Sequence, residues 1–261
     1  MTDQNALVPA GQQSSSLTFG QTALRADQFI PPRVKIVQSM SAERTGGQAA
    51  EGDFFNTLTS ESYGSIVKFL PLQLFMNRVL LVRDERRKDI EKVLDHKLSE
   101  GDGLKCRSLN MFQGVGEPGI QCASCPLSQW REGNQPPLCT EVYNVAALHE
   151  LGDLIILQFQ KSSAKTGKKL FSMIRFLGEG VAPWSRFYQA ETHSETIKGK
   201  GSFAVPVVTK TPEVPPTELM KAAQKWAQQL GAIGPIDVTP GEDEDVEAGA
   251  GGDVDDPDLP F

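Results

Sequence analysis

Two apolar stretches decide the expected fold: Val142-Tyr-Asn-Val-Ala-Ala-Leu148 and Leu154-Ile-Ile-Leu-Gln-Phe-Gln160. Both have the length of a strand and are rich in β-branched or other apolar residues. Further strand-like runs occur outward from them, at residues 34–40, 65–71, 74–82, 169–177, 187–192 and 202–208. Loop 161–169, with Gly167 as its turn residue, and loop 198–201 would each join two strands. The chain is therefore predicted to be mainly β.

Two helices are expected among these strands. Residues 83–98 have apolar side chains three or four positions apart, which predicts a short amphipathic helix. A second helix is predicted at 217–230, where Thr217 can cap the start and Gly231 can end it. One face of that helix is expected to pack on the body: Leu219, Ala223, Trp226 and Leu230. Pro206 restricts the last strand to a sheet edge, and residues 41–52 are expected to be a loop.

Hairpins separated by long insertions fit a small barrel of the oligonucleotide-binding (OB) type, with a β-sandwich as the alternative. Residues 1–26 are rich in Gln, Ser, Ala and Thr and predict a flexible N-terminal arm. The barrel domain would cover residues 27–234, with a cysteine-containing insertion at 99–140. Residues 235–261 would form a disordered acidic tail.

The charge of the chain is divided unevenly. The formal net charge is −7, from 26 Lys and Arg against 33 Asp and Glu. Residues 237–261 hold ten of the acids and no Lys or Arg, so the other 236 residues carry 26 basic and 23 acidic groups, a net of +3. This asymmetry is typical of a nucleic-acid binder with a charged interaction tail, although an acidic tail can also serve solubility alone.

The sequence predicts a cytoplasmic protein. No apolar run approaches the roughly 20 residues that a membrane span requires. Residues 1–20 are polar and lack the charged-then-apolar pattern of a secretory signal. The four cysteines are therefore expected to be reduced or bound to metal, not paired in disulfides.

The cysteines share one segment rich in Gly and Pro: Cys106, Cys122, Cys125 and Cys139. The two-residue spacing of the central pair directs two thiolates at one metal ion, and the outer pair would complete a tetrahedral site. Four thiolates leave no open coordination position, so the ion, expected to be Zn²⁺, would be structural. The alternatives are an iron–sulfur cluster, unliganded thiols and a redox pair. His96 or His149 could replace an outer cysteine, but both are expected at the surface.

Binding to a single strand requires cations for the phosphates and flat rings for the bases. Both kinds of residue gather in the second half of the chain. The candidate phosphate contacts are Lys161, Lys165, Lys168, Lys169, Arg175, Arg186, Lys198 and Lys200. The candidate stacking rings are Trp184, Phe187 and Tyr188, with Trp184 the best placed, whereas Phe159, Phe171 and Phe176 are expected in the core. Because both basic loops lie on predicted hairpins, they are expected to flank one groove. A merely solvated Lys-rich turn is the alternative.

The chain ends with Asp253-Val-Asp-Asp-Pro-Asp-Leu-Pro-Phe261. An apolar end on an acidic run suits a docking peptide, because Phe261 can fill a pocket while the acids meet a basic rim. This tail resembles that of bacterial single-stranded-DNA-binding proteins, which end in acids followed by a hydrophobic residue, Pro and Phe. The match covers Asp255, Asp256, Asp258, Leu259, Pro260 and Phe261. Pro257 interrupts the usual acidic run.

The resemblance implies a protein that protects single-stranded DNA and recruits replication, recombination and repair enzymes through its tail. In that family the tail also competes with DNA for the basic groove. Acidic tails ending in Phe occur as well in some phage single-stranded-DNA-binding proteins. The body does not resemble the compact bacterial domain, and it is similar to the zinc-containing T-even phage proteins only in its metal-type cysteine spacing. We therefore expect a divergent, phage-encoded version that acts in the host cytoplasm.

Common enzyme motifs are missing from the sequence, including the Gly-x4-Gly-Lys-Ser/Thr phosphate loop, His-Glu-x-x-His and Gly-x-Ser-x-Gly. The leading hypothesis is a non-enzymatic, sequence-independent single-strand binder. The second is a zinc-bearing regulator of transcription or recombination that reads duplex DNA. The third is a metal-dependent nuclease that uses acids such as Asp53 and Glu61.

Overall fold

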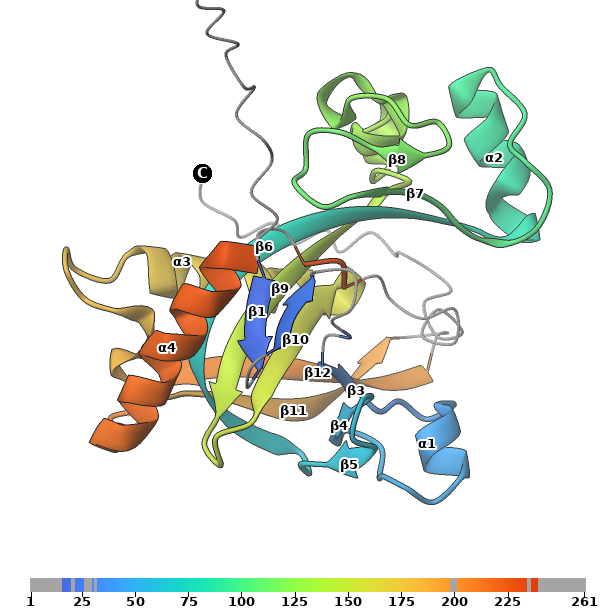
Figure 1. Ribbon diagram of the computed structural model, residues 1–261. Helices are drawn as coiled ribbons and strands as arrows, with labels where there is room; N and C mark the ends of the chain where they lie inside the picture. Colours follow the sequence, from blue (N-terminus) through green and yellow to red (C-terminus); the bar gives the residue numbers. More distant parts are fainter. Residues whose placement is uncertain are drawn as a thin grey trace, which may run out of the picture.

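The computed structural model describes residues 16–19, 22–25, 30, 32–197, 201–233 and 236–238. Most strands form one large, curled, mixed sheet in the order β12-β11-β6-β9-β10-β3-β4-β5, and β7 and β8 extend it beyond β6 (Figure 1). The strands of this sheet are β3 (Arg33–Ile36), β4 (Phe54–Asn56), β5 (Glu61–Ser62), β6 (Ile66–Val82), β7 (Gly103–Ser108), β8 (Val115–Gly116), β9 (Thr140–His149), β10 (Leu154–Gln160), β11 (Tyr188–Ile197) and β12 (Gly201–Lys210). The α-helices in the described residues are α1 (Ala42–Thr45), α2 (Asp84–Leu94), α3 (Ala164–Arg175) and α4 (Thr217–Ile233).

The strand β6 organises the sheet, because its 17 residues are long enough to pair with three partners in turn. Its start pairs with β11, its middle with β9 and its end with β7, all antiparallel. The register with β9 shifts between Pro71 and Gln73, and such an irregularity bends a strand. The sequence pattern predicted two separate runs at 65–71 and 74–82, but the structure joins them into one bent strand (Figure 1).

The sheet is open, yet side-chain hydrogen bonds link its two sides. On one side, β10 pairs antiparallel with β9 and parallel with β3. Just after β3, Gln38 donates from Nε2 to the carbonyl oxygen of Ala204 in β12 at 2.9 Å, and its Oε1 accepts the Ala204 N–H at 2.8 Å. The Thr192 hydroxyl in β11 donates to the carbonyl oxygen of Gly52 at 2.7 Å. These bonds link the two sides of the curled, open sheet.

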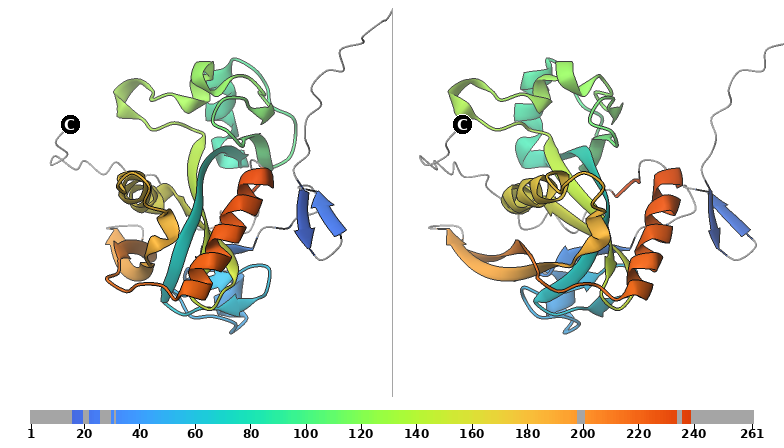
Figure 2. Two further views of the ribbon diagram at one scale, coloured as in Figure 1. Left: turned by 60° about the vertical axis from the view of Figure 1, so that its left-hand side comes forward. Right: turned by 90° about the vertical axis from the view of Figure 1, so that its left-hand side faces the viewer.

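Two apolar cores lie on opposite faces of the sheet. Val145 and Ala147 of β9 point into the inner core, whose open side α3 covers. Ala146 and Leu148, which alternate with them, point into an outer core under α4. Because successive side chains of a strand point to opposite faces, burial on both faces explains why this strand is an unbroken apolar run. Figure 2 shows α3 and α4 on the two sides of the sheet.

Several sequence predictions are confirmed. The runs at 142–148 and 154–160 are β9 and β10, and the runs at 187–192 and 202–208 belong to the β11–β12 hairpin. Pro206 does lie on an edge strand, since β12 ends the sheet order. The helices at 83–98 and 217–230 are α2 and α4, although α2 stops at Leu94, where Asp95 takes a left-handed φ of 52°.

Other predictions are wrong or incomplete. Residues 169–177 are mostly helix α3 and not a strand, and the expected loop at 41–52 contains the short helix α1. Within the predicted N-terminal arm, β1 (Ser16–Phe19) and β2 (Thr22–Arg25) pair as an antiparallel hairpin. The rest of the arm and nearly all of the acidic tail lie outside the described residues. In the part of the chain that is described, no helix has the length and apolar character to span a membrane.

Candidate nucleic-acid interface

The basic segment predicted as a hairpin loop forms the helix α3. Its buried side is Gly167, Leu170, Phe171 and Ile174, a spacing of three and four that fits one helix face. Gly167 is not a turn residue, because a Cβ built there would lie 2.8 Å from the Cβ atoms of both Phe159 and Tyr143. The absence of a side chain at Gly167 therefore lets the helix approach β9 and β10 closely. The apolar positions of α3 have the 3.6-residue spacing of a helix in the sequence. The lysines between them nevertheless made the segment look like a turn.

The opposite side of α3 carries a dense positive charge. Residues 154–178 contain five Lys or Arg and no Asp or Glu. The five are all exposed: Lys161, Lys165, Lys168, Lys169 and Arg175. Lys161 belongs to the 3₁₀ turn η5 (Lys161–Ser163) that leads into the helix. We call this surface, from Lys161 to Arg175, the basic face of α3. The structure thus brings together five of the predicted phosphate contacts on one surface, by a helix and not by the predicted hairpin.

The base of this surface is held by buried polar contacts. The Lys168 ammonium group lies 5.9 Å from the centre of the Tyr143 ring. Burial, together with the nearby carboxylate of Glu141, raises the pKa of Tyr143 to about 12, so the phenol stays protonated. Its hydroxyl donates to Glu141 Oε2 at 3.1 Å, and Arg78 pairs with the other carboxylate oxygen at 2.5 Å.

The predicted stacking rings do not reach the surface. Phe187 and Tyr188 are 2% and 0% exposed, and Tyr188 stacks against Phe69 in the inner core. Trp184 is half-buried against the outer core. Trp184 lies in the 3₁₀ turn η6 (Pro183–Ser185) and Tyr188 begins β11. Phe187 packs in the outer core and Tyr188 in the inner core, so neither ring is free to hold a base. Phe159 and Phe171 lie in the core as expected, but Phe176 is 87% exposed, which corrects its predicted place.

Arg186, another predicted phosphate contact, lies apart from α3. It lines an open pocket of about 350 Å³ together with Lys210, Thr211 and Glu213. Its Nε atom is buried and has no hydrogen-bond partner among the described residues. Lys198 and Lys200, which were predicted to join this group, lie outside the described residues.

The outer face of β9 and β10 is sealed. Ala146, Leu148 and Ile156 are fully buried beneath α4. Residues 236–238, predicted to start the disordered tail, also pack on this face: Ile236 and Val238 are buried. Gln158 of β10 donates from Nε2 to the Val238 carbonyl at 2.7 Å. Asp237 forms an ion pair with Arg107 of β7. We call this surface the sealed face.

Residues 99–139, which we call the cysteine module, fold beside the end of β6. The module has a small apolar core, in which Leu127 and Leu138 are fully or nearly buried against Leu80, Ile90 and Leu98.

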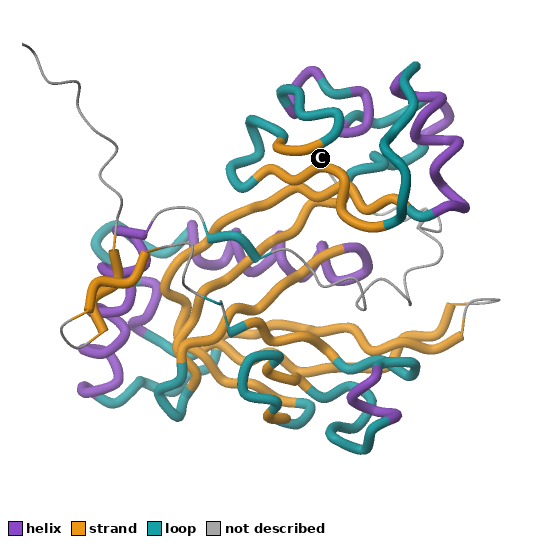
Figure 3. Tube along the Cα trace, turned by 45° about the vertical axis from the view of Figure 1, so that its right-hand side comes forward, coloured by secondary structure: helices purple, strands orange, loops and turns teal. Residues whose placement is uncertain are grey.

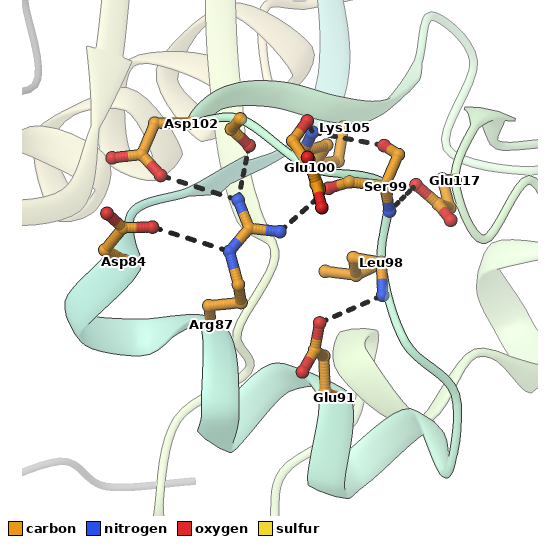
Figure 4. Close-up of polar contacts among 10 residues, drawn as sticks. Asp84, Arg87, Glu91, Leu98, Ser99, Glu100, Asp102, Lys105 and Glu117 are labelled. Carbon is orange, nitrogen blue, oxygen red and sulfur yellow. Dashed lines mark hydrogen bonds and ion pairs between the residues drawn. The ribbon is translucent and has the colours of Figure 1, made fainter.

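Polar contacts also fasten α2 to the first loop of the cysteine module. The guanidinium group of Arg87 donates to the carbonyl oxygens of Ser99, at 2.8 Å, and Gly101 (Figure 4). It also lies 3.6 Å from a carboxylate oxygen of Asp84 and 3.5 Å from one of Asp102. The module is therefore anchored both by its small core and by these contacts.

The four cysteines line one small cavity of about 20 Å³. Cys106 comes from β7, Cys122 begins the 3₁₀ turn η2 (Cys122–Ser124), Cys125 follows that turn, and Cys139 directly precedes β9. Burial raises the pKa of Cys139 to about 12, and the three neighbouring thiols add to the effect. The thiol of Cys106 is approached by the backbone N–H groups of Gly119 and Val115. The four cysteines thus line the same cavity, but they do not come together as the predicted metal-binding cluster.

The arrangement stops short of a formed metal site. Among the described residues, no three His, Cys, Asp or Glu side chains are placed so that they could hold a metal ion. Neither histidine lines the cavity. His96 is exposed, 3.6 Å from Glu117. His149 was expected at the surface but is only 5% exposed and stacks on Tyr63.

Other predicted site residues have local roles or lie outside the described chain. Asp53 Oδ2 accepts hydrogen bonds from the Ala50 N–H and the Ser62 hydroxyl, and Glu61 accepts one from Thr59. The partner-binding residues at the end of the tail, Asp255, Asp256, Asp258, Leu259, Pro260 and Phe261, lie outside the described residues.

Comparison with known proteins gives one similarity. Residues 2–100 match the model of a family described as Pam3 phage gp34-like protein, a stretch shorter than half of the chain. That stretch runs from the N-terminal arm through α2 and ends before the cysteines and α3. No curated protein and no solved structure matches the chain. The similarity suggests a phage origin.

Proposed function

We propose that this chain is a sequence-independent single-stranded-DNA-binding protein that holds the strand without cleaving it. The observation that carries the proposal is the basic face of α3, where five exposed cations stand in a 25-residue stretch without an acid. Phosphate groups supply most of the affinity in sequence-independent binding, and clustered Lys and Arg provide the matching charge. In both views of Figure 2, α3 lies between the cysteine module and the β11–β12 hairpin, which project to the same side. The proposed path of the strand follows α3 between these two elements, whose backbones Figure 3 shows from another direction.

We also propose that the curled sheet is a variant of the OB barrel. The chain order β6, β9, β10, α3, β11, β12 is that of a five-stranded barrel with a helix between its third and fourth strands. A long first strand that pairs with both the second and the fourth fits the pairing of β6 with β9 and β11. The small strand β3 pairs with β10 and β4, and Gln38 just after it bonds to Ala204 of β12, at the place where a five-stranded barrel would close. The OB fold is a common platform for single strands, which is consistent with the proposed function.

A structural Zn²⁺ bound by Cys106, Cys122, Cys125 and Cys139 is part of the proposal. The support is that all four residues line one cavity of about 20 Å³, enough for a single ion. Binding requires the thiols to turn inward and lose their protons, because the described side chains do not form a metal-holding group as they lie. We expect one zinc per chain by elemental analysis, and loss of the metal in Cys125→Ser. Metal-free wild-type protein from zinc-supplemented cells would refute the zinc site, and visible absorption would indicate an iron–sulfur cluster instead.

The proposed partners of the acidic tail are enzymes of replication, recombination and repair. The support is the sequence of the tail, in which Leu259, Pro260 and Phe261 follow closely spaced acids. Ten acids in residues 237–261 also allow the tail to compete with DNA for the basic face.

The test is binding of labelled oligo-dT, followed by fluorescence anisotropy across a salt series. Full-length protein is compared with a version that lacks residues 240–261, because removing residues 236–238 would uncover the sealed face. We expect binding that weakens with salt with a logarithmic slope of about −3, as four or five phosphate contacts would give. We expect tighter binding without the tail. Failure of both forms to bind oligo-dT at low salt would refute the proposed function.

A further inference from the structure

Phe176 is an exposed ring on a rigid support. Its exposed fraction, 87%, is the greatest of any large hydrophobic side chain that the structure describes. The residue caps the C-terminal end of α3, where its N–H donates to the Ser172 carbonyl at 3.0 Å. The next residue, Leu177, is tied to Ile174 in the same way and packs partly on the inner core. The backbone that carries the ring is therefore fixed, although the ring itself has no apolar cover.

Exposed basic residues precede Phe176 along α3, and the nearest acid after it in the chain is Glu179. Positions three or four residues apart lie on one side of a helix, so Phe176 continues the stripe that contains Lys165, Lys169 and Ser172. Arg175 is its exposed neighbour in the chain. An exposed ring within a wider apolar patch would fit a protein partner. A single exposed ring among cations suits a ligand that carries many negative charges and also has accessible flat groups. An unpaired nucleic-acid strand is such a ligand, because its bases are free to stack.

The other rings expected to stack are not available on this part of the molecule. Phe187 and Tyr188 are buried, and the outer face of β9 and β10 is covered by α4 and residues 236–238. Exposed rings do occur in the cysteine module, where Phe112 is 75% exposed. However, residues 108–130 contain no Lys or Arg, so Phe112 has no cation nearby in the chain. The other strongly exposed ring of the module, Trp130 at 70%, is followed by one cation, Arg131, which donates to the Pro136 carbonyl at 3.4 Å. Phe176 is thus the exposed ring that lies on the basic face.

We infer that Phe176 stacks on an unpaired base while Lys169 and Arg175 hold the flanking phosphates, so that α3 selects single strands over duplex. This inference rests on the proposed function, and it names Phe176 as the residue that makes the protein prefer single strands to duplex. Stacking needs a base whose face is free, and a duplex offers such faces only at its ends. The cations act on phosphate in either form. Removing the ring should therefore weaken binding to single strands alone.

The test compares full-length wild type, Phe176→Ala, Phe176→Trp and the matched control Phe112→Ala. Each binds labelled oligo-dT, an abasic strand of equal length and a duplex of equal length at one salt concentration. For Phe176→Ala we expect oligo-dT affinity to fall roughly 5- to 150-fold, the range for one stacked base. Its affinity for the abasic strand and the duplex should stay within about twofold, because the phosphate contacts remain. Phe176→Trp should keep wild-type affinity, and Phe112→Ala should change nothing.

The outcomes separate the two proposals. If wild type binds oligo-dT and Phe176→Ala binds it equally well, the stacking role is overturned and the proposed function stands. An equal loss on all three ligands would also overturn it, since that pattern reports a change in the phosphate contacts. If wild type does not bind oligo-dT, the proposed function itself fails, and this inference fails with it.

Discussion

The basic face of α3 and the sealed face of β9 and β10 present opposite surfaces on one curled sheet. The first shows five exposed cations and the exposed ring of Phe176. The second is an apolar interface in which Ala146, Ala223 and Leu230 are all 0% exposed. In an OB barrel the face of the second and third strands is the usual ligand platform. In the OB arrangement that we propose, that face belongs to β9 and β10, and it is covered by α4 and residues 236–238. Burial therefore decides which surface is free.

The largest expected effect tests whether the sealed face is structural. Leu230→Ala removes a fully buried side chain of α4 and should lower the free energy of unfolding by about 2–5 kcal/mol. Denaturant unfolding measures the loss, and Leu230→Met is the control that keeps the volume. At a temperature where the variant is folded, its oligo-dT affinity should equal that of wild type. A matching loss of affinity would show that the strand contacts this face.

Charge reversal on α3 should have the next largest effect. Lys169→Glu combined with Arg175→Glu should weaken oligo-dT binding about a hundredfold at low salt and make the salt slope shallower, because two phosphate contacts are lost and two repulsions added. The control is Lys221→Glu with Lys225→Glu, the same charge change on the exposed side of α4. If the α4 variant loses as much affinity as the α3 variant, general charge and not a defined surface holds the strand.

A smaller effect tests how closely α3 lies against the sheet. Helix propensity alone predicts that Gly167→Ala stabilises the protein by about 1 kcal/mol. The added Cβ would however lie 2.8 Å from Phe159 and Tyr143, so the helix must shift. We expect a net loss of about 1–3 kcal/mol, measured by thermal or denaturant unfolding. A gain in stability would contradict the close packing that places the basic face.

Much of the sheet could be predicted from the sequence, because the burial of a strand determines its pattern of apolar residues. The predicted strand 154–160 coincides with β10, because a strand buried on both faces must be an unbroken apolar run. The helix α4 was recognisable from its apolar stripe and its flanking prolines. In contrast, α3 was missed, since Gly167 and the lysines looked like a turn, although Leu170, Phe171 and Ile174 have helical spacing.

The sequence predicted which charged residues gather at the candidate site, but it did not predict which aromatic side chains are exposed there. The five cations were identified because an acid-free basic stretch is a property of sequence alone. Which aromatic side chains are exposed depends on packing between distant elements. Tyr188 therefore turned out to be core and Phe176 surface, the reverse of what their neighbours in the chain suggested.

The smallest expected effect concerns pH and His149, the buried last residue of β9. Burial lowers the pKa of His149 from its ordinary value of 6.5, even though Glu150 and Asp153 oppose the shift. Above that value the imidazole is neutral in both states and contributes no pH dependence. As the pH falls through 6.5, the unfolded chain binds the proton first, so the free energy of unfolding should drop by up to about 1.4 kcal/mol per pH unit. His149→Gln should flatten this part of the curve, and an unchanged slope would assign it to other groups.

The most direct test of the central claim is to locate the strand on the protein. Full-length protein is crosslinked to oligo-dT by ultraviolet light, digested, and the crosslinked peptides are identified by mass spectrometry. The account predicts crosslinks in residues 161–178, concentrated at Phe176 and lost in Phe176→Ala. Crosslinks confined to β9, β10, α4 or residues 236–238 would contradict it, because they would mean that the sealed face opens and binds the strand.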